Sequence, residues 1–81
     1  MKLTETERII LENTDARCKY IARDSGGNLC VYFKKPKKHA FFWLGDDVCL
    51  GLDAFNHLFQ SVKWENKSPV RFRNKKGEFI L

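Results

Sequence analysis

The most regular pattern of hydrophobic positions along the chain lies between residues 19 and 33, and it predicts a β-hairpin. Two runs rich in β-branched and aromatic residues, 19–23 and 29–33, flank the turn-forming segment 24–28. The two glycines of this segment reach positive φ without steric cost, as a tight reversal requires. A five-residue loop pairs Tyr20 with Tyr32, Ile21 with Val31, Ala22 with Cys30 and Arg23 with Leu29.

This hairpin is expected to be apolar on both faces. A strand pair of that kind sits centrally in a sheet and is covered on each side. We therefore expect other elements of the chain to pack above and below it. One face carries Ile21, Leu29, Val31 and Phe33, and the other carries Tyr20, Ala22, Cys30 and Tyr32.

Hydrophobic spacings of three and four residues predict two short helices. Near the N-terminus, Thr4 and Glu7 form a capping box before an apolar run, and residues 13–15 end that helix. In residues 52–62, the apolar side chains recur at three- and four-residue intervals. This spacing predicts an amphipathic helix with Asp53 near its N-cap.

The middle of the chain is expected to contain a loop and a second hairpin. Residues 34–39 are assigned to the loop, because Pro36 removes a ladder donor and the four lysines have no reason to be buried. Residues 40–44 and 48–50 are expected to pair as strands around the turn 45–47.

The C-terminal segment alternates again and predicts a third hairpin. Residues 70–73 and 79–81 form its strands, with Arg71 and Arg73 in solvent. No linker divides the chain, so we expect a small single α+β domain over residues 1–81. Its antiparallel sheet has about four to six strands, accompanied by one or two short helices.

Composition assigns the chain to ordinary folded domains. Hydrophobic residues make up 43% and charged residues 31%, which is unlike a disordered chain. The longest apolar run, residues 40–44, is too short to span a bilayer, and the N-terminus lacks the apolar stretch of a secretory signal. We expect a cytoplasmic protein with no membrane partner.

The three cysteines do not suggest a disulfide framework or a metal site. In the hairpin register, Cys18 and Cys30 are offset by about 13 Å, which is too far for a disulfide. Zinc ligands are usually paired two to four residues apart, and Cys49, His39 and His57 do not supply such a pair. Reduced thiols and no cofactor are expected.

Motifs for catalysis are weak in this chain. Cys49 and His57 would act as nucleophile and base only if the tertiary fold happened to join them. The acidic residues Asp46, Asp47 and Asp53 are more simply turn and cap residues than cation ligands. The chain has no glycine-rich phosphate loop and no Gly-x-Ser-x-Gly motif, so we do not expect an enzyme.

Charge is distributed in blocks, although the net charge is only +5. Basic residues dominate 17–39 and 61–81, while 40–60 contain no lysine or arginine. The basic side chains could neutralise phosphates while aromatic rings such as Tyr20, Tyr32 or Trp43 stack on bases. Alternatively, they are solvated charges that keep a small β-domain soluble and its edges unpaired. The candidates for nucleic-acid binding are Lys34, Lys35, Lys37, Lys38, Arg71, Arg73, Lys75 and Lys76.

The aromatic run 41–43 offers a different kind of surface. Three consecutive aromatic residues on a strand point to opposite faces, so either both faces are covered or at least one ring is exposed. An exposed ring would anchor a protein partner, and core packing is the alternative. The candidates for protein contact are Phe41, Trp43 and Trp64.

Several segments together resemble a family of small uncharacterised proteins carried by bacteriophages and prophages of Gram-positive bacteria. They are Tyr-Ile-Ala-Arg-Asp at 20–24, Lys-Pro-Lys-Lys at 35–38 and Leu-Asp-Ala-Phe-Asn-His-Leu-Phe-Gln-Ser-Val-Lys-Trp-Glu at 52–65. The resemblance covers about residues 19–69 and is most specific around 55–65. It implies a phage origin and a bacterial cytoplasm as workplace, and it brings no catalytic residues.

These observations lead to three functional hypotheses. The first is a non-enzymatic interaction protein of phage origin that binds a host or phage macromolecule, for example as an inhibitor of a bacterial enzyme or defence component. The second is a nucleic-acid-binding module that uses the two basic blocks, and the third and weaker one is a binder of a small anionic ligand such as a nucleotide. The identity of the partner and the oligomeric state stay open.

Overall fold

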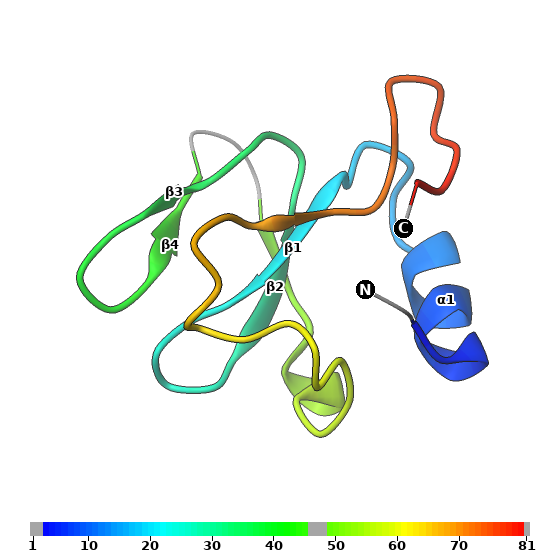
Figure 1. Ribbon diagram of the computed structural model, residues 1–81. Coiled ribbons are helices and arrows are strands. Elements are labelled where there is room, and N and C mark those ends of the chain that lie inside the picture. The colour runs from blue at the N-terminus through cyan, green and yellow to red at the C-terminus, as the bar shows by residue number, and fades with distance from the viewer. Residues whose placement is uncertain (1–2, 46–48, 81) are drawn as a thin grey trace.

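An antiparallel sheet forms the centre of the computed structural model, which describes residues 3–45 and 49–80 (Figure 1). Its strands, in spatial order, are β5 (Cys49–Gly51), β2 (Leu29–Tyr32), β1 (Tyr20–Arg23) and β6 (Val70–Arg71). The register of β1 and β2 confirms the predicted hairpin, including the end pairs Tyr20 with Tyr32 and Arg23 with Leu29. This hairpin is central in the sheet because both of its faces are apolar and need cover.

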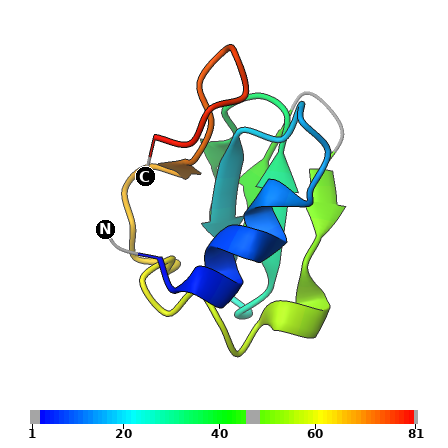
Figure 2. The ribbon, with the colours of Figure 1, turned by 90° about the vertical axis from the view of Figure 1, so that its right-hand side faces the viewer.

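The helix α1 (Glu5–Glu12) lies on one face of the sheet, as Figure 2 shows. Beneath it is the larger of two hydrophobic clusters, which also receives side chains from residues 59–62 and from the C-terminal segment. Its position confirms the predicted apolar face of the β1–β2 hairpin. The buried members are Leu11, Cys18, Ile21, Leu29, Val31, Phe59, Val62 and Phe72.

A two-stranded ribbon covers the opposite face. It consists of β3 (Lys37–Lys38) and β4 (Trp43–Leu44), and it lies on the side of the sheet away from α1 (Figure 1). The smaller cluster lies between ribbon and sheet, with Ala22, Tyr32 and Trp43 buried and Tyr20, Cys30 and Trp64 packed around them. Helix and ribbon therefore provide the predicted cover on the two faces.

The predicted capping box of α1 is confirmed. The Thr4 hydroxyl accepts a hydrogen bond from the Glu7 amide at 3.2 Å, and the Glu7 carboxylate accepts one from the Thr4 amide at 3.0 Å. The second carboxylate oxygen of Glu7 accepts from the backbone amide of Phe59 at 2.6 Å. A single buried side chain thus caps the helix and fastens it to the distant segment 52–62.

The amphipathic helix predicted over 52–62 is wrong. Only a single 3₁₀ turn, η1 (Asp53–Phe55), forms there, and Asp53 is its first residue rather than a side-chain cap. The chain then turns irregularly, with Phe59 in the left-handed region at φ 56°. The guanidinium of Arg23 explains this path, because it binds carbonyl groups that an α-helix would use internally. It donates to the carbonyls of Asn56, Leu58, Phe59 and Val62 at 2.8–3.2 Å.

The second predicted hairpin is also wrong. Its proposed strands belong to different sheets, since β4 pairs with β3 while β5 pairs with β2. Residues 37–38, expected in a loop, form a strand because they pair with the aromatic segment that follows them. Most of the predicted turn at 45–47 lies outside the described residues.

The C-terminal reversal is confirmed in a reduced form. The turn closes with a hydrogen bond from the Asn74 amide to the Glu78 carbonyl at 3.0 Å, and Gly77 takes φ 85°. Among residues 70–80 the ladder is limited to one bridge between Arg73 and Phe79, while β6 pairs with β1. The architecture is that of a small α+β domain, and no helix in the described ranges is long and apolar enough to cross a membrane.

Candidate functional site

Lys38, a predicted phosphate ligand, is engaged by its own chain. Its ammonium nitrogen lies 4.1 Å from the centre of the Trp64 ring and 5.4 Å from that of Trp43. It also donates hydrogen bonds to the backbone carbonyls of Trp64 and Asn66. Lys38 therefore ties the β3–β4 ribbon to residues 64–66, a structural role that uses its donors.

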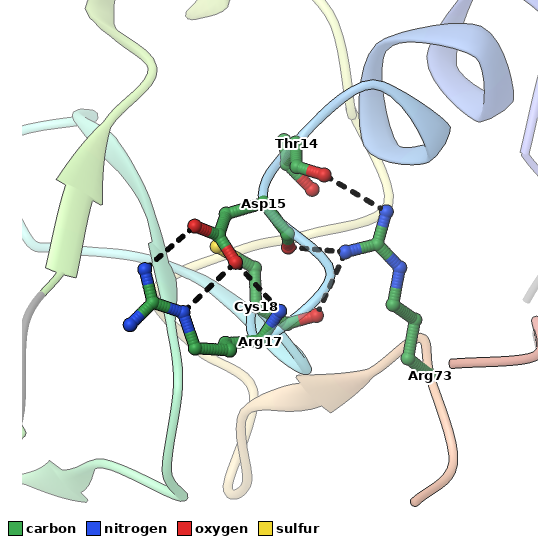
Figure 3. A network of polar contacts seen from close by, with 5 residues as sticks. All are labelled: Thr14, Asp15, Arg17, Cys18 and Arg73. Atoms are coloured by element: carbon green, nitrogen blue, oxygen red, sulfur yellow. Dashed lines mark hydrogen bonds and ion pairs between the residues drawn. The ribbon is translucent and has the colours of Figure 1, made fainter. Parts of the chain in front are cut away.

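Arg73, another predicted phosphate ligand, is buried, and the expectation that it lies in solvent is wrong. Its side chain is 4% exposed and reaches the end of α1. Figure 3 shows the guanidinium directed at the backbone around Thr14, Asp15 and Cys18. It donates to the carbonyls of Leu11, Thr14, Asp15 and Cys18, at the end of α1 and in the segment that follows it.

Three of the predicted basic residues meet at one cavity. Lys34 follows β2, whereas Lys75 and Lys76 lie in the C-terminal turn, and the fold brings them to the same opening of about 400 Å³. We call this opening the cationic cavity. Its lining also includes the ring of Phe33 and two basic residues that the sequence reasoning missed, Arg17 and Lys19. Both belong to the basic block 17–39, and this membership is the signal that could have selected them.

Arg17 is held in a fixed orientation at this cavity. The carboxylate of Asp15 accepts hydrogen bonds from Nε of Arg17 at 3.1 Å, from Nη2 at 2.8 Å and from the backbone amide at 2.9 Å (Figure 3). These bonds from Arg17 lower the pKa of Asp15 to about 2. The guanidinium carbon lies 4.7 Å from the centre of the Phe33 ring, which places the cation over the ring in a cation–π contact.

Among the basic residues of the cationic cavity, Arg17 is paired with the Asp15 carboxylate at 2.8 Å. None of the cavity's lining residues is acidic. Within the described parts of the chain, Lys19, Lys34, Lys75 and Lys76 form no ion pair. Positive charges that line one depression raise the local concentration of anions.

A second candidate surface lies at the tip of the β3–β4 ribbon. Phe41 is 72% exposed and Phe42 46% exposed, and the ring of His39 stacks on Phe42 with centroids 5.2 Å apart. The backbone below these rings is fixed, because the amide and the hydroxyl of Ser25 both donate to the Phe41 carbonyl, at 3.1 and 2.8 Å. We call residues 39–42 the aromatic tip.

The other predicted protein contacts lie inside the molecule. Trp43 is 6% exposed and donates from its indole nitrogen to the Arg23 carbonyl at 3.1 Å. Trp64 is half-buried and meets Trp43 edge to face at 6.2 Å. Of the three predicted residues, Phe41 alone is mostly in solvent, and Phe42 joins it as a residue that was not singled out.

The remaining predicted basic residues lie outside the cavity lining. Lys35 is exposed before β3, and Lys37 is exposed as the first residue of that strand. Arg71 is exposed on β6, and its guanidinium lies 5.8 Å from the ring of Tyr20. These side chains remain available to solvent, but the cavity does not include them.

Cys18 lies in the larger hydrophobic cluster and Cys30 packs against the smaller one. Cys18 is buried, which raises the pKa of its thiol, and Cys30 is half-buried beside Tyr32. Among residues 3–45 and 49–80, no three His, Cys, Asp or Glu side chains gather closely enough to hold a metal ion. His57 is exposed on the segment after η1.

Comparison with known protein families, with curated proteins and with solved structures finds no match for the chain.

Proposed function

We propose that this chain is a non-enzymatic interaction protein of phage origin that docks on a bacterial protein through the aromatic tip. The observation that carries the proposal is the contrast at Phe41, whose ring is 72% exposed while its carbonyl is held by two hydrogen bonds from Ser25. A phage origin is supported by the resemblance of residues 19–69 to small phage proteins.

An aromatic side chain on a fixed backbone is suited to binding. Aromatic residues supply large contact areas at low conformational-entropy cost, and a preorganised backbone reduces the ordering that binding requires. The aromatic tip therefore has the properties of an interaction anchor.

The surroundings of the tip indicate the chemistry of its partner. Lys37 is exposed on β3 and pairs across the ribbon with Leu44, which is also exposed. A matching surface would contain an apolar pocket for Phe41 and acidic side chains near Lys37. An enzyme or a defence component of the bacterial cell is the proposed partner, and its inhibition is the proposed effect.

The experiment is affinity capture from lysate of a Gram-positive bacterium, followed by binding measurements with the purified captured protein. The test variant is Phe41→Ala, and the matched control is Ile9→Ala, because Ile9 is 52% exposed on α1. We expect the wild type and the control to capture the same protein and the test variant to bind it at least about tenfold more weakly.

Two results would contradict this function. One is that no protein is enriched by the wild-type chain over a blank matrix. The other is that Phe41→Ala binds the captured protein as tightly as Ile9→Ala does, which would remove the tip from the interface.

A further inference from the structure

The cationic cavity is a second binding site that the aromatic tip does not use. The two surfaces lie at opposite ends of the β1–β2 hairpin, since Lys19 and Phe33 flank its open end and Ser25 lies in its turn. In Figure 1, the C-terminal turn and the β1–β2 turn are correspondingly far apart. A ligand of the cationic cavity is therefore separate from the partner of the aromatic tip.

We propose that the cationic cavity binds a nucleotide unit, with its phosphate among the lysines and its base stacked on Arg17. The inference is drawn from the convergence of three chain segments on one opening: residues 16–19, 33–34 and 75–77. All charged side chains of its lining are basic, and an apolar ring lies among them.

The lysines account for the phosphate. Lys19, Lys34, Lys75 and Lys76 form no ion pairs in the described residues, so their mutual repulsion is relieved when an anion enters. Lysine ammonium groups bind phosphate oxygens as point charges without a strict angular requirement. Their positions on separate segments allow them to surround a single phosphate or two successive ones.

Arg17 accounts for the base. Its guanidinium carbon lies 4.7 Å from the centre of the Phe33 ring, and the Asp15 carboxylate fixes the guanidinium through Nε and Nη2. The Arg17 side chain is 72% exposed, so a ligand can reach it from solvent. Planar guanidinium groups are stacking surfaces for unpaired bases. A base that enters from solvent can stack on this guanidinium.

This combination distinguishes a nucleotide from other anions. A phosphate-rich polymer without bases would contact the lysines but would place no group against Arg17 and Phe33. An acidic protein segment would bring carboxylates, but it offers no flat aromatic group of the same kind for the guanidinium. A free nucleotide and a single strand share the required chemistry, and the experiment separates these two sources.

Fluorescence anisotropy with a labelled oligothymidylate of about eight nucleotides, at about 20 mM salt, tests the site. Lys34→Glu/Lys75→Glu should weaken binding by about 30-fold or more and reduce the salt slope by about two. The matched control is Lys63→Glu/Lys67→Glu, which changes the net charge equally at exposed lysines outside the cavity. The control should bind within about threefold of the wild type, as should Phe41→Ala.

Arg17→Lys isolates the contribution of stacking to binding, because it keeps the positive charge and removes the planar guanidinium group. We expect this variant to bind oligothymidylate about tenfold more weakly than the wild type and to bind an abasic oligomer of the same length with unchanged affinity. Displacement of the probe by dTMP would support a free nucleotide as occupant, and binding of the oligomer alone would support a single strand.

Four outcomes would overturn the proposal. The first is that neither the oligomer nor dTMP binds, and the second is that the normal and the abasic oligomer bind with equal affinity. The third is that the two double lysine variants lose the same amount of affinity. The fourth is that polyglutamate displaces the probe as effectively as unlabelled oligothymidylate does. Circular dichroism of each variant establishes that a lost signal is not a lost fold.

Discussion

Arginine side chains bind several backbone carbonyls at two places where regular secondary structure ends or is absent. Arg73 does so at the end of α1 and in the segment after it, and Arg23 does so beside residues 56–62. A guanidinium presents five donors in a fixed fork, which lets one side chain satisfy carbonyls that point in several directions. These residues determine local conformation across more than thirty positions of sequence separation.

Arg23→Lys tests this role at a single residue. Arg23 donates to five carbonyls, and a lysine can satisfy only some of them. We expect the free energy of unfolding in urea to fall by about 2–3 kcal/mol. The control, Arg8→Lys, alters an exposed pair with Glu12 and should cost less than about 0.5 kcal/mol. Equal losses in the two variants would show that the carbonyl contacts of Arg23 add no stability.

Asp15 gives the second prediction at this scale, and its sign follows from the direction of the shift. Hydrogen bonds from Arg17 lower the pKa of Asp15 from 3.8 to about 2 in the folded chain. Its contribution to stability is therefore complete above the unfolded pKa and is lost as the pH falls through the folded pKa. Thermal melting of the wild type and of Asp15→Asn should differ near neutral pH and converge between about pH 4 and pH 2. A difference that is constant over that interval would contradict the prediction.

At the scale of elements, those specified by neighbouring residues could be predicted, and those specified by distant contacts could not. The capping box set the start of α1, and the turn 24–28 set the register of β1 and β2. The spacing in residues 52–62 matched a helix, but the Arg23 guanidinium and the Glu7 carboxylate bind that segment in another conformation. A local pattern has no access to such partners, and tertiary contacts override helix propensity.

The candidate site shows the same division. Lys34, Lys75 and Lys76 could be selected by composition, since they belong to the basic blocks. Their meeting with Arg17 at one cavity depends on how the C-terminal turn packs beside the start of β1, which no motif encodes. Exposure within the aromatic run depended likewise on the ribbon, which turns Trp43 inward and leaves Phe41 outside.

The ribbon provides a prediction at the element scale. Trp43 is the buried side chain through which the ribbon packs on the sheet. Trp43→Ala should therefore lower the free energy of unfolding by about 3–5 kcal/mol or prevent folding. Phe41→Ala, two residues earlier, should change it by less than about 0.5 kcal/mol because the ring is in solvent. Urea denaturation of both variants measures the difference. A large loss for Phe41→Ala would mean that its ring packs in the core and cannot serve as an anchor.

For the molecule as a whole, the arrangement of charge matters more than its total. The net charge is +5, and five of the basic residues line one cavity at the open end of the β1–β2 hairpin. Arg17 is paired with Asp15, and repulsion among the other four, all lysines, opposes folding at low ionic strength because the Debye length there exceeds the size of the cavity. An anionic ligand would relieve the same repulsion. The stability of the ligand-free protein at different salt concentrations therefore measures how strongly the charges at the cavity repel one another.

This repulsion predicts a melting temperature that rises with salt. Between about 20 and 200 mM sodium chloride, we expect an increase of about 3 °C for the wild type. Lys34→Glu/Lys75→Glu should lose most of that increase, whereas Lys63→Glu/Lys67→Glu should keep it, although each pair lowers the net charge from +5 to +1. The comparison separates charge at the cavity from charge in general. A salt response that is equally reduced in both pairs would mean that total charge governs stability and that the cavity is not a focus of repulsion.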